Sequence, residues 1–109
     1  MGITYKVLGQ SNPTLNTNTP LYTVPAATSA VVSTVSVCNQ VSTPASFSIA
    51  VQPAGASLTN KHYVYYNTVI AGYSTVNLTL GITMATTDVM TCNANTSTVS
   101  FNVFGSEIN

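Results

Sequence analysis

Charged side chains are almost absent from this sequence. Four of the 109 residues carry a formal charge, 4% of the chain, and they balance to zero: Lys6, Lys61, Asp88 and Glu107. In an ordinary globular chain roughly a quarter of the residues are charged. A nucleic-acid-binding protein needs a basic patch to neutralise phosphates, so this composition argues against a nucleic-acid partner. Low charge and a net charge near zero favour association with other protein surfaces.

Groups that could carry out catalysis are equally scarce. Hydrolysis by paired carboxylates needs two acids at a defined separation, and Asp88 and Glu107 are the only acids available. His62 is the only histidine, and no GxSxG motif accompanies the serines. One histidine and two distant cysteines do not supply the ligand cluster of a zinc site. We therefore expect no enzymatic activity, no cofactor and no bound metal.

Tryptophan and long apolar runs are also missing. Immunoglobulin-type sandwiches have a core tryptophan, so the lack of Trp makes that kind of sandwich a poor fit. No stretch of about eighteen apolar residues occurs. Residues 1–9, MGITYKVLG, contain no apolar run of the length found in signal peptides. We expect neither a membrane span nor a cleaved signal peptide.

The two cysteines, Cys38 and Cys92, lie in strand-like segments. They could face each other across two sheets and form a disulfide, or they could remain buried thiols that pack as small apolar residues. We favour the second interpretation, in which both are core residues.

The sequence is rich in alternating apolar and polar residues, which is typical of β-strands. In residues 46–51, Phe47, Ile49 and Val51 share one face, and Ser or Ala occupies the other. Residues 75–80 and 98–103 repeat the pattern. With less regular segments there are about eight candidate strands: 3–8, 21–24, 31–38, 46–51, 63–66, 75–80, 88–92 and 98–103. Each has one face suited to a core and one to solvent.

Turn residues separate these strands, and one longer segment does not alternate at all. Eight short strands in about a hundred residues predict an all-β fold. We expect a single-domain antiparallel β-sandwich, or a jelly roll, over residues 1–109. Residues 10–20 are polar and contain two prolines, so an extended arm or loop is predicted there. Such a segment either connects two strands or lies across a neighbouring subunit.

Residues 61–66, KHYVYY, concentrate the reactive and aromatic side chains. In a regular strand Lys61, Tyr63 and Tyr65 would share one face, and His62 and Tyr66 would share the other. Tyrosine suits half-buried positions and is enriched at protein interfaces. We interpret the segment first as a strand of the sandwich and second as a contact surface, with a sugar-binding aromatic shelf as a further alternative. The candidate interface residues are Lys61, His62, Tyr63, Tyr65, Tyr66, Asn12, Pro13 and Leu15.

Six short blocks occur together in this sequence. They are KVLGQ (residues 6–10), LYTVPA (21–26), VCN (37–39), PAGA (53–56), KHY (61–63) and FGSE (104–107). In this combination the chain resembles small structural proteins of tailed bacteriophages, particularly those of cyanobacterial phages. The resemblance runs from about residue 6 to residue 107, and it lies in strand and turn segments and includes no catalytic signature.

The resemblance implies a non-enzymatic virion component, with a capsid cement (decoration) protein as the leading expectation. Such a protein sits on the outer capsid surface, often as a trimer, and clamps adjacent capsid subunits. The implied partners are the major capsid protein and further copies of this chain in a homotrimer, located on the capsid surface after assembly in the host cytoplasm. The alternatives are a tail or baseplate component and a carbohydrate-binding module for a host surface glycan. No site residue follows from the resemblance, because a cement protein acts through its surfaces.

Overall fold

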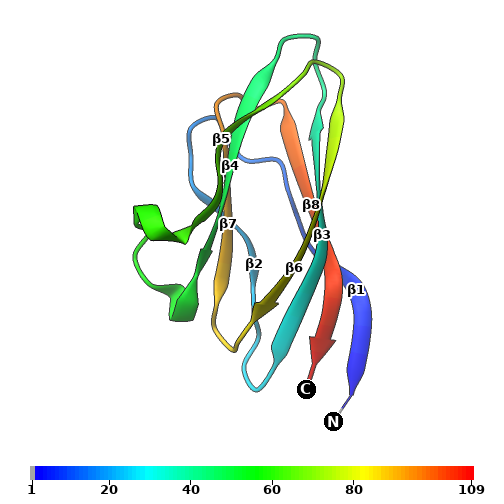
Figure 1. Ribbon diagram of the computed structural model, residues 1–109, viewed down its shortest axis with the longest axis vertical. Helices are drawn as coiled ribbons and strands as arrows, with labels where there is room; N and C mark the ends of the chain where they lie inside the picture. The colour runs from blue at the N-terminus through cyan, green and yellow to red at the C-terminus, as the bar shows by residue number, and fades with distance from the viewer. Residues whose placement is uncertain (1) are drawn as a thin grey trace.

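Eight strands account for most of the chain in the computed structural model, which describes residues 2–109 (Figure 1). The strands are β1 (Ile3–Ser11), β2 (Thr19–Thr23), β3 (Ser29–Asn39), β4 (Ala45–Gln52), β5 (Tyr63–Ile70), β6 (Thr75–Met84), β7 (Val89–Ala94) and β8 (Val99–Ile108). Two short 3-10 turns, η1 (Pro53–Gly55) and η2 (Asn60–His62), lie between β4 and β5. The described residues include no helix long and apolar enough to cross a membrane. The all-β prediction is confirmed.

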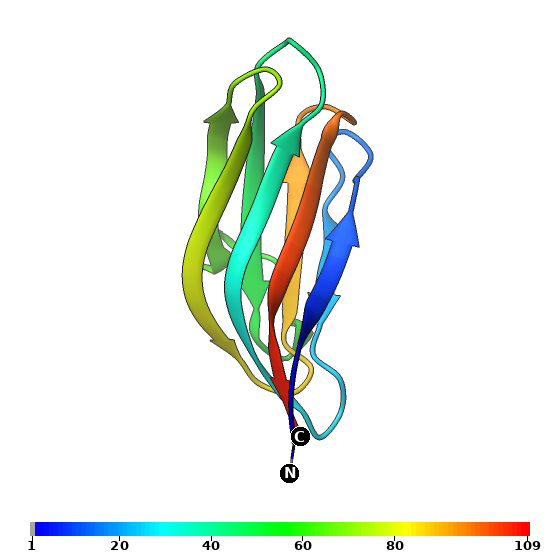
Figure 2. The same ribbon diagram turned by 90° about the vertical axis from the view of Figure 1, so that its right-hand side faces the viewer.

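The strands form two antiparallel sheets, β1-β8-β3-β6 (sheet 1) and β2-β7-β4-β5 (sheet 2), with sheet 1 nearer the viewer in Figure 2. The pairings β1–β8, β2–β7, β3–β6 and β4–β5 are those of one long hairpin folded at its middle. Further pairing of β3 with β8 and of β4 with β7 rolls this hairpin into two layers. This is the topology of a jelly roll, the more specific of the two predicted architectures.

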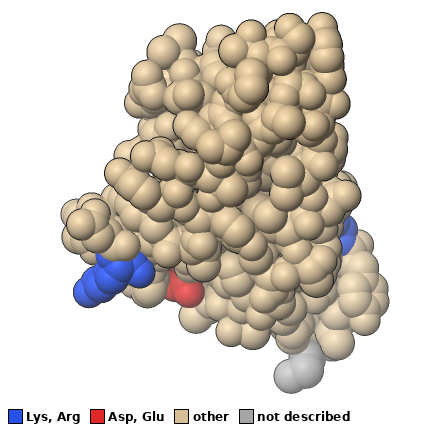
Figure 3. Space-filling model, turned by 45° about the horizontal axis from the view of Figure 1, so that its top comes forward, with Lys and Arg blue, Asp and Glu red and all other residues tan. Residues whose placement is uncertain are grey.

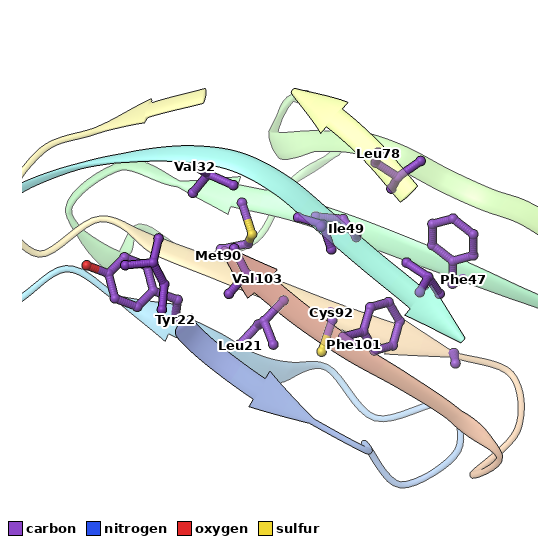
Figure 4. Close-up of a cluster of buried hydrophobic side chains, with 14 of the residues drawn as sticks. Leu21, Tyr22, Val32, Phe47, Ile49, Leu78, Met90, Cys92, Phe101 and Val103 are labelled. Carbon is purple, nitrogen blue, oxygen red and sulfur yellow. The ribbon is translucent and has the colours of Figure 1, made fainter. Parts of the chain in front are cut away.

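The core lies between the two sheets and follows the predicted alternation. Val99, Phe101 and Val103 of β8 are fully buried, as are Phe47 and Ile49 of β4. Figure 4 shows several of these side chains meeting between the layers. The rings of Phe47 and Phe101 meet edge to face, with centroids 6.1 Å apart. Because each fully buried side chain of this kind contributes roughly 1.5–3 kcal/mol, these two inner faces hold the sheets together.

A β-bulge changes the alternation of β1. The pairing of β1 with β8 shifts register between Val7 and Gly9, so Leu8 is an extra residue. Residues after a bulge point to the opposite face from the one that strict alternation predicts. Before the bulge, Ile3, Tyr5 and Val7 lie on the outer face of sheet 1 and Leu8 is buried, and beyond it the alternation is reversed.

The non-alternating segment predicted at residues 10–20 is shorter in the structure. Its first two residues belong to β1 and its last two to β2, which leaves residues 12–18 as the loop. The bulge explains the polar end of β1, because Gln10 then lies on the outer face of the sheet. There its Nε2 donates a hydrogen bond to Oδ1 of Asn102 at 2.7 Å.

Both cysteines are free thiols. Cys92 is fully buried on the inner face of β7, as predicted. Cys38 lies between the buried residues Val37 and Asn39 of β3, so it points to the outer face and is partly exposed. The interpretation of two core residues is correct for Cys92 and wrong for Cys38.

Candidate functional site

The KHYVYY segment begins with a turn and not with a strand. Lys61 and His62 belong to η2, and β5 starts at Tyr63, so a strand over all six residues is wrong. Nδ1 of His62 accepts a hydrogen bond from the backbone N–H of Thr59 at 3.0 Å. The backbone N–H of His62 in turn donates to the carbonyl oxygen of Thr59 at 3.1 Å. These two bonds close the turn and hold His62 buried, while Lys61 is exposed.

Register shifts in β5 decide which tyrosines share a face. The pairing of β5 with β4 shifts twice between Tyr63 and Thr68. Tyr65 consequently packs against the core, with its ring centroid 6.2 Å from that of Phe47. Tyr63 and Tyr66 lie together on the outer face, where their rings meet edge to face at 4.9 Å. The expectation that Tyr63 and Tyr65 share a face is wrong, because strict alternation holds only in a strand without bulges.

The connection from β4 to β5, residues 53–62, covers one end of the outer face of sheet 2. Its η1 turn contacts β7, and its η2 turn contacts β4. The outward-facing residues Ala50 and Thr91 are buried, although they lie outside the main core. Oδ1 of Asp88 accepts a hydrogen bond from the backbone N–H of Ala54 at 2.8 Å, which fastens this connection to the loop before β7. The rest of the outer face stays open.

Two adjoining hollows occupy the open part of this face. The first, of about 420 Å³, is lined by Asn60, Tyr63 and Tyr66. The second, of about 270 Å³, is lined by Asn16, Asn18, Ser48, Tyr63, Tyr66, Asn67 and Asn93. Because both hollows share the two tyrosines, we treat them as one site and call it the tyrosine groove. It crosses sheet 2 from β5 to the loop between β1 and β2.

Asparagine side chains supply most of the hydrogen-bonding groups in the tyrosine groove. Nδ2 of Asn93 donates to Oδ1 of Asn18 at 2.7 Å, which leaves the other amide atom of each residue available. The backbone N–H of Asn67 donates to Oγ of Ser48 at 3.0 Å. Asn16 is fixed by a 2.7 Å hydrogen bond from its own backbone N–H to β7. The groove thus presents amide groups on well-anchored backbone beside two aromatic rings, and the amides of Asn18 and Asn93 are themselves held in place.

The tyrosine groove is electrically neutral. No charged side chain among the described residues lines either hollow. Figure 3 shows how sparse charge is on one face of the molecule, where charged atoms form only a few separate spots. A charged ligand would therefore form no ion pair with the residues that line the groove.

Two of the four charged side chains form an ion pair between β1 and β8. Nζ of Lys6 lies 3.2 Å from Oε1 of Glu107, and the Tyr22 hydroxyl donates to Oε2 of the same carboxylate at 2.6 Å. The Tyr22 hydrogen bond, aided by Lys6, lowers the pKa of Glu107 below its ordinary value. Burial and the neighbouring carboxylate raise the pKa of Tyr22. These groups satisfy one another, so they are a structural link between strands.

A second surface feature lies on the outer face of sheet 1. Four apolar side chains are exposed there: Ile3 (58%), Tyr5 (82%), Val7 (46%) and Phe104 (37%). Val7 and Phe104 are direct partners in the β1–β8 register. We call these four residues the apolar stripe. It follows β1, which forms one edge of sheet 1.

The predicted interface residues of the loop between β1 and β2, which are Asn12, Pro13 and Leu15, lie apart from the apolar stripe. Nδ2 of Asn12 donates to the carbonyl oxygens of Ser97 at 3.0 Å and Val99 at 2.8 Å. Pro13 is buried, and Leu15 is half exposed. The following residues of this loop, Asn16 and Asn18, reach the tyrosine groove. The structure therefore brings the two predicted segments together, through asparagines that the sequence reasoning did not select.

The sequence did not predict the asparagines of the groove or the apolar stripe, for two different reasons. Asn16 and Asn67 have positive φ angles of 54° and 47°, a conformation that asparagine tolerates better than most residues. That tolerance is a usable local signal for an exposed turn, but it does not predict that the two residues meet. The apolar stripe was missed because apolar residues of a strand were assigned to the core.

Within residues 2–109, no group of three or more His, Cys, Asp or Glu side chains is arranged to hold a metal ion. Comparisons of the chain with protein-family models, with curated proteins and with solved structures find no match. The similarity to phage structural proteins therefore stays a prediction from the sequence blocks.

Proposed function

We propose that this chain is a non-enzymatic virion structural protein, a capsid cement protein that binds the outer shell between major capsid protein subunits. The sequence blocks that resemble phage structural proteins are the first support. The jelly roll is a second, since viral capsid domains use this architecture, although lectin domains use it too. A fold alone does not define a function, so the proposal rests on a surface.

The observation that carries the proposal is the apolar stripe. It is built on paired strands, and the nearest charged groups, Lys6 and Glu107, alternate with the stripe residues along β1 and β8, so they lie on the other side of the sheet, where they bind each other. An exposed apolar patch on a folded domain marks a site for contact with another surface. A partner surface can cover the apolar stripe without burying a charged side chain. We therefore assign the contact with the shell to sheet 1.

The exposed area of the stripe indicates how strongly one copy of the chain would bind the shell. Its four side chains are 37–82% exposed, so covering them contributes roughly 3–7 kcal/mol at about 1.5–3 kcal/mol per fully buried side chain. Association itself costs about 4–15 kcal/mol. One copy would bind weakly, whereas copies joined in a homotrimer would bind firmly, because each later contact is intramolecular. A trimer also matches the local threefold positions of an icosahedral shell.

This assignment moves the main contact away from the residues selected in the sequence. His62, Tyr65 and Pro13 point inward or are buried. Tyr63 and Tyr66 line a groove with amide groups, which suits a polar ligand better than an apolar protein surface. Sheet 2 is therefore left open when sheet 1 binds the shell.

The test is co-sedimentation of the chain with empty shells of a cyanobacterial tailed phage that lack their cement protein. The wild-type chain should pellet with the shells and saturate. Replacement of Tyr5 and Val7 by Ser should abolish most of this binding, because it removes the two central side chains of the stripe. Tyr73→Ser is the matched control, since Tyr73 is 76% exposed in the loop between β5 and β6. Wild-type binding by the double variant would refute the role of the stripe, and no binding of the wild type would refute the proposed function.

A further inference from the structure

The tyrosine groove lies on the sheet opposite the apolar stripe, so the two surfaces can be occupied at the same time. The lining residues come from β5 (Tyr63, Tyr66 and Asn67), β4 (Ser48), β7 (Asn93) and the loop before β2 (Asn16 and Asn18). Four separate segments of the chain thus converge on one polar hollow with an aromatic side. A convergence of this kind is the usual form of a ligand site.

The groups in the groove define the chemistry of its ligand. Each free amide offers both a donor and an acceptor, so a ligand with many hydroxyl groups can satisfy several of them at once. Tyr66 is exposed and Tyr63 is half-buried, so the pair offers apolar ring surface with hydroxyl groups at the tips. A pyranose ring combines these needs, because it has C–H faces and a rim of hydroxyls.

Other ligand classes fit the groove less well. A nucleic acid would require several cations to neutralise its phosphates, and Lys61 is the only cation on this side of β5 within the described residues. An anionic sugar would likewise find no charge among the lining residues. An apolar peptide would leave the amides of the groove without partners, which is costly.

Two of these amides, and the backbone that carries the other two, are also held before any ligand arrives. The 2.7 Å hydrogen bond between Asn93 and Asn18 joins β7 to the adjoining loop. The Asn67 backbone is held by Ser48 in the β5 irregularity. Within residues 2–109, the side-chain amides of Asn16 and Asn67 make no hydrogen bond of their own. Preorganised polar groups bind with less loss of entropy than mobile ones.

We propose that the tyrosine groove is a binding site for a neutral oligosaccharide. The rings of Tyr63 and Tyr66 stack on the sugar, and the amides of Asn16, Asn18, Asn67 and Asn93 bind its hydroxyls. On this basis the chain carries a glycan-binding face on sheet 2, independent of whatever sheet 1 contacts.

The experiment is an NMR titration of the full ¹⁵N-labelled chain with four soluble probes: cellohexaose, maltohexaose, mannohexaose and, as a charged comparison, hexagalacturonic acid. At least one neutral hexasaccharide should cause saturable shifts at the backbone amides of Ser48, Asn67 and Asn93. Its affinity should be the same in low and high salt, because no ion pair is formed. The absence of saturable shifts with all three neutral probes would overturn the proposal, as would tighter binding of the charged one.

Paired variants test whether the named residues carry the binding. Tyr66→Ala should weaken the affinity about ten-fold, in line with the loss of one stacked ring, and Asn18→Ala should also weaken it. Tyr66 is 65% exposed, so its removal should leave the remaining amide signals in place and the fold intact. Tyr73→Ala is the control and should bind as the wild type does. Equal affinities for Tyr66→Ala and Tyr73→Ala would contradict the assignment of the site.

Discussion

Two phenylalanines of β8 point to opposite faces of sheet 1, one toward the core and one toward the outside. Phe101 is fully buried and meets Phe47 between the sheets. Phe104, three residues along the same strand, is 37% exposed and belongs to the apolar stripe. Since their positions differ by three, an odd number, the two side chains point to opposite faces of the strand. The same substitution at the two positions should therefore have different consequences.

Phe101→Ala should lower the free energy of unfolding by about 3–5 kcal/mol, because it leaves a cavity where no solvent enters. For a chain of this length the entropy of unfolding is about 0.23 kcal/mol/K, so the melting temperature should fall by roughly 13–22 °C. Phe104→Ala should cost only about 1–2 kcal/mol and lower the melting temperature by roughly 4–9 °C, because that side chain is 37% exposed. If Phe101→Ala is too unstable to purify, Phe101→Leu should show a smaller shift in the same direction.

The assays are thermal unfolding followed by circular dichroism and co-sedimentation with shells. Phe104→Ala should keep most of its stability and weaken shell binding, whereas Phe101→Leu should lose stability and keep its binding while folded. Similar losses of stability at the two positions would refute the orientation of β8. Full shell binding by Phe104→Ala would count against the stripe as the contact surface.

Two further predictions concern titratable groups. Hydrogen bonding from Tyr22, aided by Lys6, keeps the folded-state pKa of Glu107 below its ordinary value of 4.5, so its stabilising effect is present above that pH and is lost as the pH falls through the folded pKa. The free energy of unfolding should therefore fall more steeply below pH 4.5 in the wild type than in Glu107→Gln, and parallel curves would contradict this linkage. Burial raises the pKa of the Cys92 thiol to about 11, so at pH 8 a thiol reagent should label Cys38 in the native chain and reach Cys92 only after unfolding. Equal labelling rates at the two cysteines would be inconsistent with the burial of Cys92.

Much of the fold follows from alternation alone. The segments that alternate most clearly, such as residues 46–51 and 98–103, are strands whose apolar members are buried. Alternation is a local property of a two-residue repeat, and it is visible without knowledge of strand partners. Strand ends were predicted less well, because β6 continues to Met84 and β8 to Ile108 through residues that show no simple pattern.

The candidate site was harder to predict because β-bulges determine which side chains point toward it. Whether Tyr65 points inward with Phe47 or outward with Tyr63 depends on the register shifts within β5. In β1, the extra residue Leu8 determines which of the side chains that follow it lie on the outer face of sheet 1. Bulges of this kind arise from the fit between two strands and leave little trace in either sequence segment alone. The meeting of Asn18 with Asn93 likewise depends on strands distant in the sequence.

The most direct test of the cement role is a cryo-electron microscopy reconstruction of shells saturated with the purified chain. We expect density for the sandwich at repeated positions on the outer surface, between capsid subunits, with the β1 side of sheet 1 against the shell. The face of sheet 2 that carries the tyrosine groove should point to solvent. Bare shells, or density on tail structures alone, would contradict the proposed function. Density attached through sheet 2 would instead contradict the assignment of the apolar stripe as the contact surface.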